Sequence, residues 1–421
     1  MFDWSAHSWI IVLVGFLAAV SCSLLGIFLV LRRMSLVADA ISHAVLPGIA
    51  IAFLLTGSRE PVTMLLGAGA VGVLATFLIE WVHRRGGIQA DAAIGIVFTS
   101  LFALGVVIIS AKAGMVDLDQ DCVLYGEIAY SPWDTLVIGG KSLGVRPLWI
   151  LGFIAIINML FIGLFFKELK LSTFDPALAT TLGFSAMLLH YALMGLVSLT
   201  TVAAFEVVGA ILVVAMFVIP AATAYLLTDR LALMVLWAVV ISAGIALGGY
   251  AMARALDASI AGSMSMVAGL FFLAAFLLSP SHGVIPRAAA RWKLKLRIAV
   301  EDWLAHTWRR RESVTPSRHD PDASQFMRSP WLPLLLRWKR LAKKRDGGEW
   351  ILTDAGSTAA AAVIRRHRSW EGFLYDEFGV PADHVHRPAH DAEHFLTEDL
   401  TGIGEVVTPD RKDPHSSEIP G

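Results

Sequence analysis

The sequence predicts an all-α polytopic membrane protein with eight or nine transmembrane helices, followed by a small, mainly helical cytoplasmic C-terminal domain. Of the 421 residues, 56% are hydrophobic and only 16% are charged, whereas about 25% of the residues of an average soluble domain are charged. The mean hydropathy is +0.65. Long apolar runs fill the chain before Pro286, and the remainder is charged. This composition excludes a disordered chain and argues against an ordinary soluble enzyme.

The apolar runs are long enough to be transmembrane helices, because roughly 20 mainly apolar residues cross about 30 Å of hydrocarbon. Nine runs approach this length: Trp9–Leu31, Ile41–Thr56, Val62–Val82, Ala92–Ala111, Leu148–Phe166, Ser185–Thr200, Glu206–Leu227, Leu231–Tyr250 and Ser263–Ser279. The second run is short and contains Pro47, so it could be a full span or a re-entrant segment. The count is therefore eight or nine.

The orientation of the spans follows from the Lys and Arg residues of the short connections, which favour the cytoplasmic side. Basic residues follow alternate runs, and Arg287–Arg311 holds eight basic residues against two acidic ones. Nine spans place these basic groups in the cytoplasm and the N-terminus outside. Eight spans place both ends inside. Both alternatives leave the C-terminus in the cytoplasm.

An acidic residue and a histidine stand four residues apart at the start of the second run. Asp39 and His43 would share one face of a helix and could reach the same ion. Pro47 lacks the N–H that would bond the His43 carbonyl, so this oxygen is also free to bind. A carboxylate, an imidazole and a carbonyl suit Mn²⁺, Fe²⁺ or Zn²⁺. The alternative is an Asp–His pair that caps a helix at the membrane boundary.

Glu206 is a second acidic residue within an apolar run, and no basic residue lies near it in the sequence. Burying a carboxylate there is costly unless it is protonated, paired or bound to a cation. We therefore predict a functional role for Glu206.

The segment from Arg33 to Gly48, which contains Asp39 and His43, resembles the signature of bacterial ABC-transporter permeases for manganese, zinc and iron. The later segments 205–215 and 220–227 look like the second signature of that family. The resemblance covers about Trp9–Ser281. It implies that Asp39 and His43 are ligands of the translocating metal ion. Glu206 stands where family members carry a polar or acidic residue.

The resemblance also implies partners: a cytoplasmic ATP-binding subunit, a second permease subunit (the same chain or a homologue), and an extracytoplasmic metal-binding protein, in the lipid bilayer of a bacterial cytoplasmic (inner) membrane. The chain has no Gly-x-x-x-x-Gly-Lys-Ser/Thr loop, so another polypeptide must hydrolyse ATP. We expect a transporter subunit that is not itself an enzyme. No permanent cofactor is expected, and the divalent ion is substrate and regulator.

A polar stretch between two runs, residues 167–184, is the expected contact with the ATP-binding subunit. Asp175 can cap a short helix with Pro176 at its first position, and Gly183 suits its end. This stretch looks like the short helix through which such permeases dock onto the ATPase. The expected coupling residues are Phe174, Asp175, Pro176, Leu178 and Gly183. The alternative is a plain connection between two spans.

The region after Pro286 contains eight of the thirteen histidines. His367 and Glu371 are spaced i and i+4, so both can face one ion on a helix. His390 and His394 repeat this spacing with Glu393 between them. Two such pairs within thirty residues predict metal binding, although a solvated helix face can also be rich in histidine.

From about Trp350 to Leu400 the sequence resembles the metal-sensing half of the diphtheria toxin repressor family of iron- and manganese-dependent regulators. The resemblance implies two sets of metal ligands. His367, Glu371 and His386 match one set; Glu393 and His394 match part of the other, and His390 stands where some members have Cys. Residues 301–345 look like a degraded winged helix-turn-helix, in which Pro333 interrupts an expected helix. DNA is therefore not an expected partner.

These observations divide the chain into a transmembrane permease domain (1–286), a basic linker and degraded winged-helix-like region (287–348), a metal-sensor-like helical region (349–400) and a polar tail expected to be disordered (401–421). The basic residues of Arg287–Arg311, with Trp292, Trp303 and Trp308 among them, suit an amphipathic helix on anionic lipid.

The function predicted from the sequence is import of a divalent transition metal, with manganese favoured over zinc and iron. The cytoplasmic region would sense metal and slow transport when internal metal is high. Three alternatives stay open: a fusion remnant used only for dimer packing, a membrane-anchored metal-dependent transcription regulator, and a permease for a metal chelate.

Overall fold

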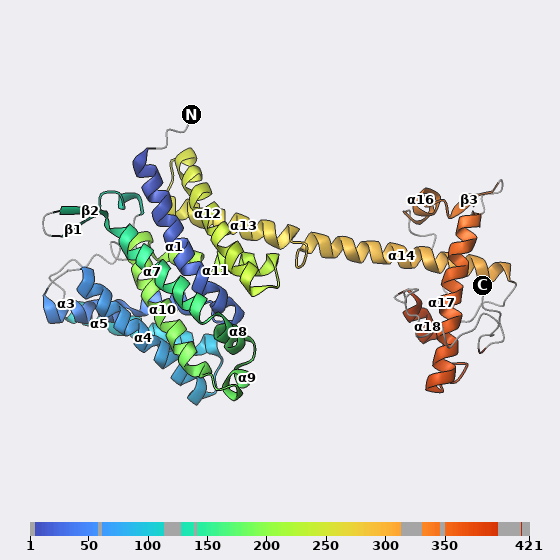
Figure 1. Ribbon diagram of the computed structural model, residues 1–421, viewed down its shortest axis with the longest axis horizontal. Coiled ribbons are helices and arrows are strands. Elements are labelled where there is room, and N and C mark those ends of the chain that lie inside the picture. Colours follow the sequence, from blue (N-terminus) through green and yellow to red (C-terminus); the bar gives the residue numbers. More distant parts are fainter. Residues whose placement is uncertain are drawn as a thin grey trace. The chain divides into compact units, whose positions relative to one another are not determined.

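The computed structural model describes residues 5–57, 61–112, 128–138, 141–312, 331–345, 350–394 and 414. The chain divides into two compact units, Met1–Pro286 and Arg287–Gly421. Both units are mainly helical (Figure 1). Residues 113–127 and nearly all of the polar tail 401–421 lie outside the described residues.

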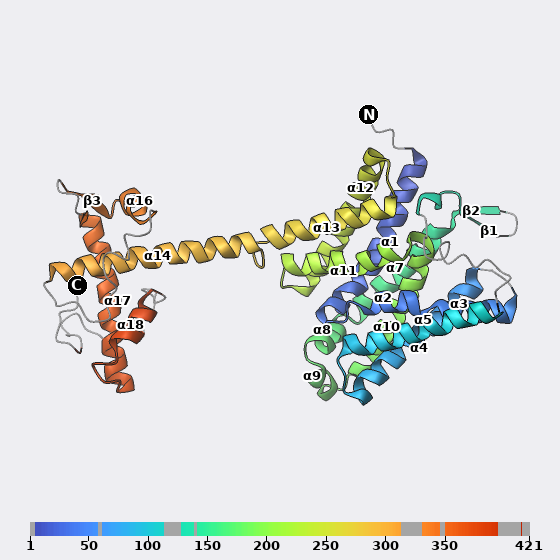
Figure 2. The same ribbon diagram turned by 180° about the vertical axis from the view of Figure 1, so that it is seen from behind.

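The first unit is a bundle of long apolar helices (Figure 2). Its helices are α1 (Ala6–Leu31), α2 (Val37–Ala44), α3 (Leu46–Thr56), α4 (Pro61–Gly86), α5 (Ala90–Lys112), α7 (Arg146–Leu164), α8 (Phe166–Phe174), α9 (Pro176–Thr181), α10 (Ala186–Val208), α11 (Ala210–Leu227), α12 (Leu231–Leu256) and α13 (Ile260–Leu278). A 3₁₀ turn, η1 (Ile128–Tyr130), precedes an antiparallel hairpin of β1 (Thr135–Ile138) and β2 (Lys141–Val145). Within the described ranges, nine helical segments are long and apolar enough to span a membrane. The predicted polytopic all-α fold is confirmed.

The second span combines α2 and α3. Val45 between them keeps helical backbone angles, with φ −75° and ψ −13°, so the segment extends over 20 residues from Val37 to Thr56. Pro47 lies in the first turn of α3, where a missing N–H costs little. A Cβ at Gly105 of α5 would lie only 2.8 Å from the Pro47 nitrogen. The segment that the sequence left open as re-entrant thus has the length of a full span.

The boundary between the sixth and seventh spans differs from the sequence prediction. The hydropathy pattern ends the sixth run at Thr200 and begins the next at Glu206, whereas α10 continues to Val208. Gly209, with φ 81° and ψ 163°, makes the break, because these angles are accessible mainly to glycine. Glu206 therefore lies in the last turn of α10 and not at the start of α11.

Helix α1 lies at the centre of the first unit, among α7, α10, α11 and α12. A Cβ at Gly26 would overlap the carbonyl oxygen of Phe217 in α11, so the two backbones touch. The buried Asn158 of α7 donates to the Ser21 carbonyl at 3.1 Å and to Thr200 Oγ1 of α10 at 2.9 Å. Small residues and internal hydrogen bonds of this kind hold helices together in a membrane, because the hydrophobic effect contributes little to helix association in lipid.

The second unit contains most of α14 (Val284–Arg311), followed by α16 (Trp331–Trp338), the antiparallel strands β3 (Ala342–Lys344) and β4 (Trp350–Leu352), α17 (Asp354–Phe378) and α18 (His386–Glu393). Its small core contains Val300, Trp303, Leu304, Leu332, Leu336, Ala342, Leu352 and Ala360. Pro333 falls in the first turn of α16 and does not interrupt the helix.

Candidate functional site

Asp39 and His43 point toward each other from one face of α2. His43 Nε2 lies 3.6 Å from Asp39 Oδ1, and the two side chains are 34% and 43% exposed, respectively. Leu36 precedes the helix, and no side chain caps it. The alternative that Asp39 is a helix cap therefore does not hold for α2. The pair is open to an approaching ion or to a partner chain.

Aromatic rings of α5 border the histidine. The His43 ring lies 6.3 Å from the Phe98 ring and 6.2 Å from the Phe102 ring, centroid to centroid. The imidazole therefore has a carboxylate on its own helix and two apolar rings on the neighbouring helix close to it. The helical spacing brings the two ligand atoms to one face of α2.

The Asp39–His43 pair can share one divalent ion without large movement. Metal–oxygen and metal–nitrogen bonds of about 2.1 Å would span the 3.6 Å between the two atoms. Two side chains do not complete the coordination of such an ion. Water, a backbone carbonyl or groups of a partner must supply the other ligands.

Glu206 has a partner that the sequence could not reveal. Arg146 at the first position of α7 donates through Nη2 to Glu206 Oε1 at 2.8 Å. Arg146 also lies 4.0 Å from Asp134. Among the described residues, Glu206 belongs to no group of three donor atoms that could hold a metal. Pairing with a cation thus offsets the cost of its charge in this structure.

The polar stretch between α7 and α10 forms the two short helices α8 and α9. Asp175 Oδ1 accepts a hydrogen bond from the Leu178 amide at 2.9 Å, Pro176 is the first residue of α9, and Gly183 follows the helix with φ 87°. These are the caps that the sequence predicts. The exposed apolar side chains of this stretch are Phe174, Leu178, Leu182 and Phe184. Such a surface is suited to contact with another protein.

In the second unit, α17 and α18 bring together His367, Glu371 and His386. The Nε2 atom of His367 lies 3.0 Å from Glu371 Oε1 and 3.0 Å from His386 Nδ1, and this Nδ1 lies 2.8 Å from the same carboxylate oxygen. Three ligands at right angles and about 2.1 Å from one ion would stand about 3 Å apart. The three side chains already have this spacing.

The charges of this first cluster are also suited to a cation. His367 and Glu371 are both only 2% exposed. Burial raises the pKa of Glu371, but hydrogen bonds from His367 and His386 outweigh this effect and hold the pKa far below its usual range. The carboxylate is therefore ionised and neutralises part of an ion's charge. This cluster contains the ligand set that the repressor resemblance implies.

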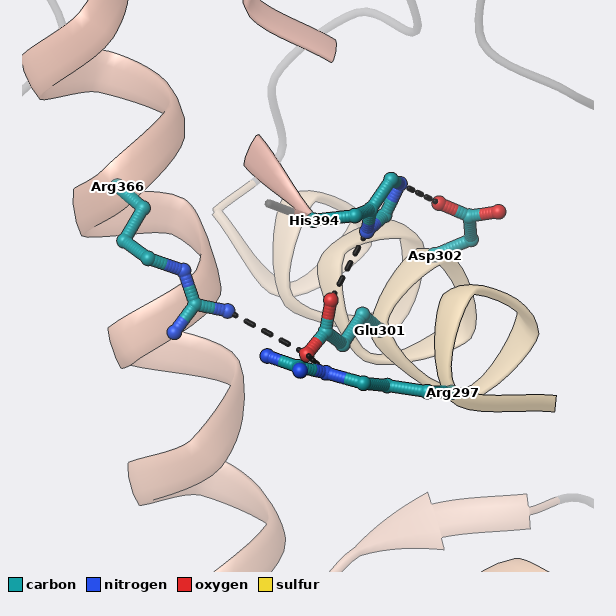
Figure 3. Close-up of polar contacts among 5 residues, drawn as sticks. All are labelled: Arg297, Glu301, Asp302, Arg366 and His394. Atoms are coloured by element: carbon teal, nitrogen blue, oxygen red, sulfur yellow. Dashed lines mark hydrogen bonds and ion pairs between the residues drawn. The ribbon is translucent and has the colours of Figure 1, made fainter. Parts of the chain in front are cut away.

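A second cluster consists of Asp302, His390 and His394, whose donor atoms lie within 4.8 Å of one another. Asp302 comes from α14, and Figure 3 shows its carboxylate facing the His394 ring. Asp302 Oδ1 is buried, accepts no hydrogen bond and lies 3.1 Å from His394 Nε2. A buried oxygen without a hydrogen bond, next to two imidazoles, suits a metal ion. The Glu393 side chain lies outside the described residues.

The other nitrogen of His394 is held by Glu301 (Figure 3). The Nδ1 atom lies 2.9 Å from Glu301 Oε2, and Arg297 and Arg366 contact Oε1 of the same carboxylate at 3.0 and 3.5 Å. Burial raises the pKa of Glu301, but the hydrogen bonds from His394 and Arg297 lower it below its usual value. A carboxylate that fixes the far nitrogen of a histidine is a common support of metal ligands.

Sequence reasoning missed Asp302 and Glu301, because they lie far from the histidines along the chain. One signal was present: they are the two acidic residues within the basic stretch Arg287–Arg311.

Two family models match the chain. The model described as the ABC 3 transport family matches residues 8–279. The chain belongs to the ABC 3 transport family. The model described as the metal binding and dimerisation domain of iron dependent repressors matches residues 353–421. Both resemblances predicted from the sequence are confirmed. The spans of this ABC 3 transport chain form a transport domain. The alternative of a membrane-anchored transcription regulator, in which the spans would serve only as an anchor, is therefore not favoured.

Named relatives of this ABC 3 transport chain are membrane proteins of metal transport systems. The manganese transport system membrane protein MntD of Bacillus subtilis (strain 168) is 47% identical over 67% of this chain and 95% of its own. The zinc transport system membrane protein TroD of Treponema pallidum (strain Nichols) is 42% identical over 73% of this chain and 83% of its own.

A solved structure, PsaBC from Streptococcus pneumoniae in complex with Fab, contains a similar chain. The similarity has a TM-score of 0.54 and 32% sequence identity, and it covers 66% of this chain and 94% of the other. The transmembrane architecture of this ABC 3 transport chain thus agrees with that of a solved relative.

Proposed function

We propose that this chain is the permease subunit of an importer for divalent transition metal ions, with manganese as the main cargo and zinc and iron as further candidates. The observation that carries the proposal is the Asp39–His43 pair, 3.6 Å apart on α2 of an ABC 3 transport chain. Relatives named for manganese and zinc transport support the choice of ion.

In this proposal the ion exchanges part of its water shell for the Asp39 carboxylate and the His43 imidazole. The pair is incomplete as a coordination shell, so a second permease subunit, a carbonyl or water supplies the remaining ligands. The ion leaves when a conformational change separates the ligands and spoils their geometry. Glu206 is a further candidate contact on this pathway if an ion displaces Arg146.

ATP hydrolysis belongs to a separate cytoplasmic subunit, which docks on α8 and α9. The exposed apolar side chains Phe174 and Leu178, and the caps formed by Asp175, Pro176 and Gly183, support this assignment. An extracytoplasmic metal-binding protein delivers the ion. The protein lies in a bacterial cytoplasmic membrane, with the C-terminal region in the cytoplasm.

Uptake by a variant without the carboxylate tests the assignment of the metal pair. We expect Asp39→Ala to abolish Mn²⁺ uptake by cells that contain the complete transporter, while the variant still reaches the membrane. Asp91→Ala is the matched control, because Asp91 is an exposed acidic residue of α5. Undiminished uptake by the Asp39 variant would refute the site.

We further propose that the second unit senses cytoplasmic metal and slows transport when metal is abundant. Two clusters of metal donors support it: His367, Glu371 and His386 in one, and Asp302, His390 and His394 in the other, with Glu393 as a further candidate ligand. Metal binding would bias the unit between two arrangements, which act on the permease or on its ATPase. DNA has no part in this proposal.

Removal of the second unit tests the sensor. We expect a chain truncated after Pro286 to keep importing Mn²⁺ in metal-replete cells, in which the full chain slows. His367→Ala in the full chain should have the same effect. If the truncated chain slows as the full chain does, the second unit is not the sensor and serves another purpose, such as dimer packing.

A further inference from the structure

A single arginine at the end of α1 contacts two other helices directly and a third through a histidine. Arg32 donates to Thr173 Oγ1 at 3.1 Å and to Ser172 Oγ at 3.0 Å, both on α8. Its Nη1 atom lies 3.2 Å from His190 Nδ1 on α10. A guanidinium can only donate, so His190 Nδ1 accepts this hydrogen bond. His190 Nε2 in turn lies 3.4 Å from Glu80 Oε2 on α4.

A tight turn connects this arginine to α2. The Met34 amide donates to the Leu29 carbonyl at 2.8 Å, and the Arg33 amide donates to the Val30 carbonyl at 3.1 Å. These two bonds form a Schellman motif. Arg33 occupies the left-handed position of this motif with φ 58°, a position where glycine is the usual residue. Because α2 begins at Val37, only a short, hydrogen-bonded turn separates the arginine from the helix that carries Asp39 and His43.

The helices joined by the arginine also pack against α2. A Cβ at Gly72 of α4 would overlap Ser198 of α10 and lie 3.4 Å from Ile41 of α2. The side chains of Ser198 and Ile41 therefore both pack against the backbone of α4 at Gly72. Ile41 lies between Asp39 and His43 in the sequence, so a shift of α4 or α10 reaches the segment that carries the metal pair.

We propose that Arg32 is a positioning residue that couples the docking helices α8 and α9 to the Asp39–His43 pair. This inference rests on the proposed transport function. Movement of α8 carries the Ser172 and Thr173 hydroxyls, and the guanidinium follows them because both hydroxyls accept from it. The start of α2 moves with the guanidinium. A flat guanidinium can hold α8 and α10 at once, which the compact ammonium of lysine cannot do equally well.

The test compares two neighbouring arginines in the complete transporter. Wild type, Arg32→Gln and Arg33→Gln are reconstituted in liposomes with the ATP-binding and metal-binding proteins. Mn²⁺ uptake and ATP hydrolysis are measured on the same vesicles. Arg33 is exposed, so Arg33→Gln removes the same charge from the same turn. We expect Arg32→Gln to lower the number of ions moved per ATP by about tenfold, and Arg33→Gln to leave this ratio unchanged.

A second variant removes the acceptors and keeps the arginine. The double variant Ser172→Ala with Thr173→Val should also lower the number of ions moved per ATP. If the Arg32→Gln transporter fails to assemble, this double variant provides the test. A purely structural role would reduce uptake and hydrolysis together and leave the ratio intact. Wild-type ratios in both variants would overturn the inference while leaving the transport function standing. Failure of the wild type to import Mn²⁺ would instead overturn the proposed function.

Discussion

The Nδ1 atom of His394 lies 2.9 Å from a carboxylate oxygen of Glu301, the residue that precedes Asp302 in α14. This contact turns the other ring nitrogen, Nε2, toward the Asp302 carboxylate, 3.1 Å away. One helix therefore supplies both a candidate metal ligand and the group that orients a second ligand.

The role of Glu301 can be tested by its amide variant. We expect Glu301→Gln to weaken Mn²⁺ binding at the second cluster by about 10- to 100-fold, the usual effect of losing an outer-shell partner. Titration of the full-length protein in a His367→Ala background measures this cluster apart from the first one. Glu377→Gln, an exposed change on α17, is the control. Equal affinities in the two variants would show that Glu301 does not position His394.

Metal should stabilise the second unit locally. An ion at 100 times its dissociation constant stabilises the bound form by about 2.7 kcal/mol. We expect Mn²⁺ to slow amide hydrogen exchange in α17 and α18, which carry His367, Glu371 and His386, and chelation to reverse the effect. Exchange in α12, which carries no candidate ligand, is the internal reference. Unchanged exchange in α17 and α18 at saturating Mn²⁺ contradicts metal binding there.

The close approach of α1 and α11 predicts a sharp difference between two glycines. Because a Cβ at Gly26 would overlap the Phe217 carbonyl oxygen, we expect Gly26→Ala to destabilise the protein by about 1–3 kcal/mol. Gly152→Ala on α7 meets open space and should be tolerated. Thermal unfolding in detergent compares the two variants. A Gly26 variant as stable as the Gly152 variant would contradict this helix packing.

The ion pair between Arg146 and Glu206 predicts that exchanging the charges of these two residues restores part of the Mn²⁺ uptake that a single charge reversal removes. Glu206→Arg places two cations together and should impair Mn²⁺ uptake, and adding Arg146→Glu should restore part of it. The stability effect is expected to be small, about 1 kcal/mol or less, because both groups are partly exposed. If the double variant is no better than Glu206→Arg, the carboxylate has a role beyond this pair.

Short-range patterns predicted much of the structure. The i, i+4 spacing placed Asp39 beside His43 and His367 beside Glu371, because residues one helical turn apart share a face. The caps of α9 followed in the same way from Asp175 and Gly183. Apolar run lengths predicted the spans, since the thickness of a bilayer fixes the length of a helix that crosses it.

Long-range partners could not be predicted from such patterns. Arg146 and Glu206 are 60 residues apart in the chain, and Asp302 meets His390 only through the folding of the second unit. Hydropathy also misplaced Glu206, because apolar residues flank Gly209 on both sides and only the backbone angles of this glycine reveal the break. Pairings of this kind depend on tertiary packing, which a single sequence does not display.

Direct location of the ion tests the central claim. A structure of the complete transporter in saturating Mn²⁺, with anomalous scattering at the manganese edge, should place an ion within bonding distance, about 2.1 Å, of both Asp39 and His43. Anomalous density elsewhere, with the two side chains still in contact and no ion between them, would contradict the claim.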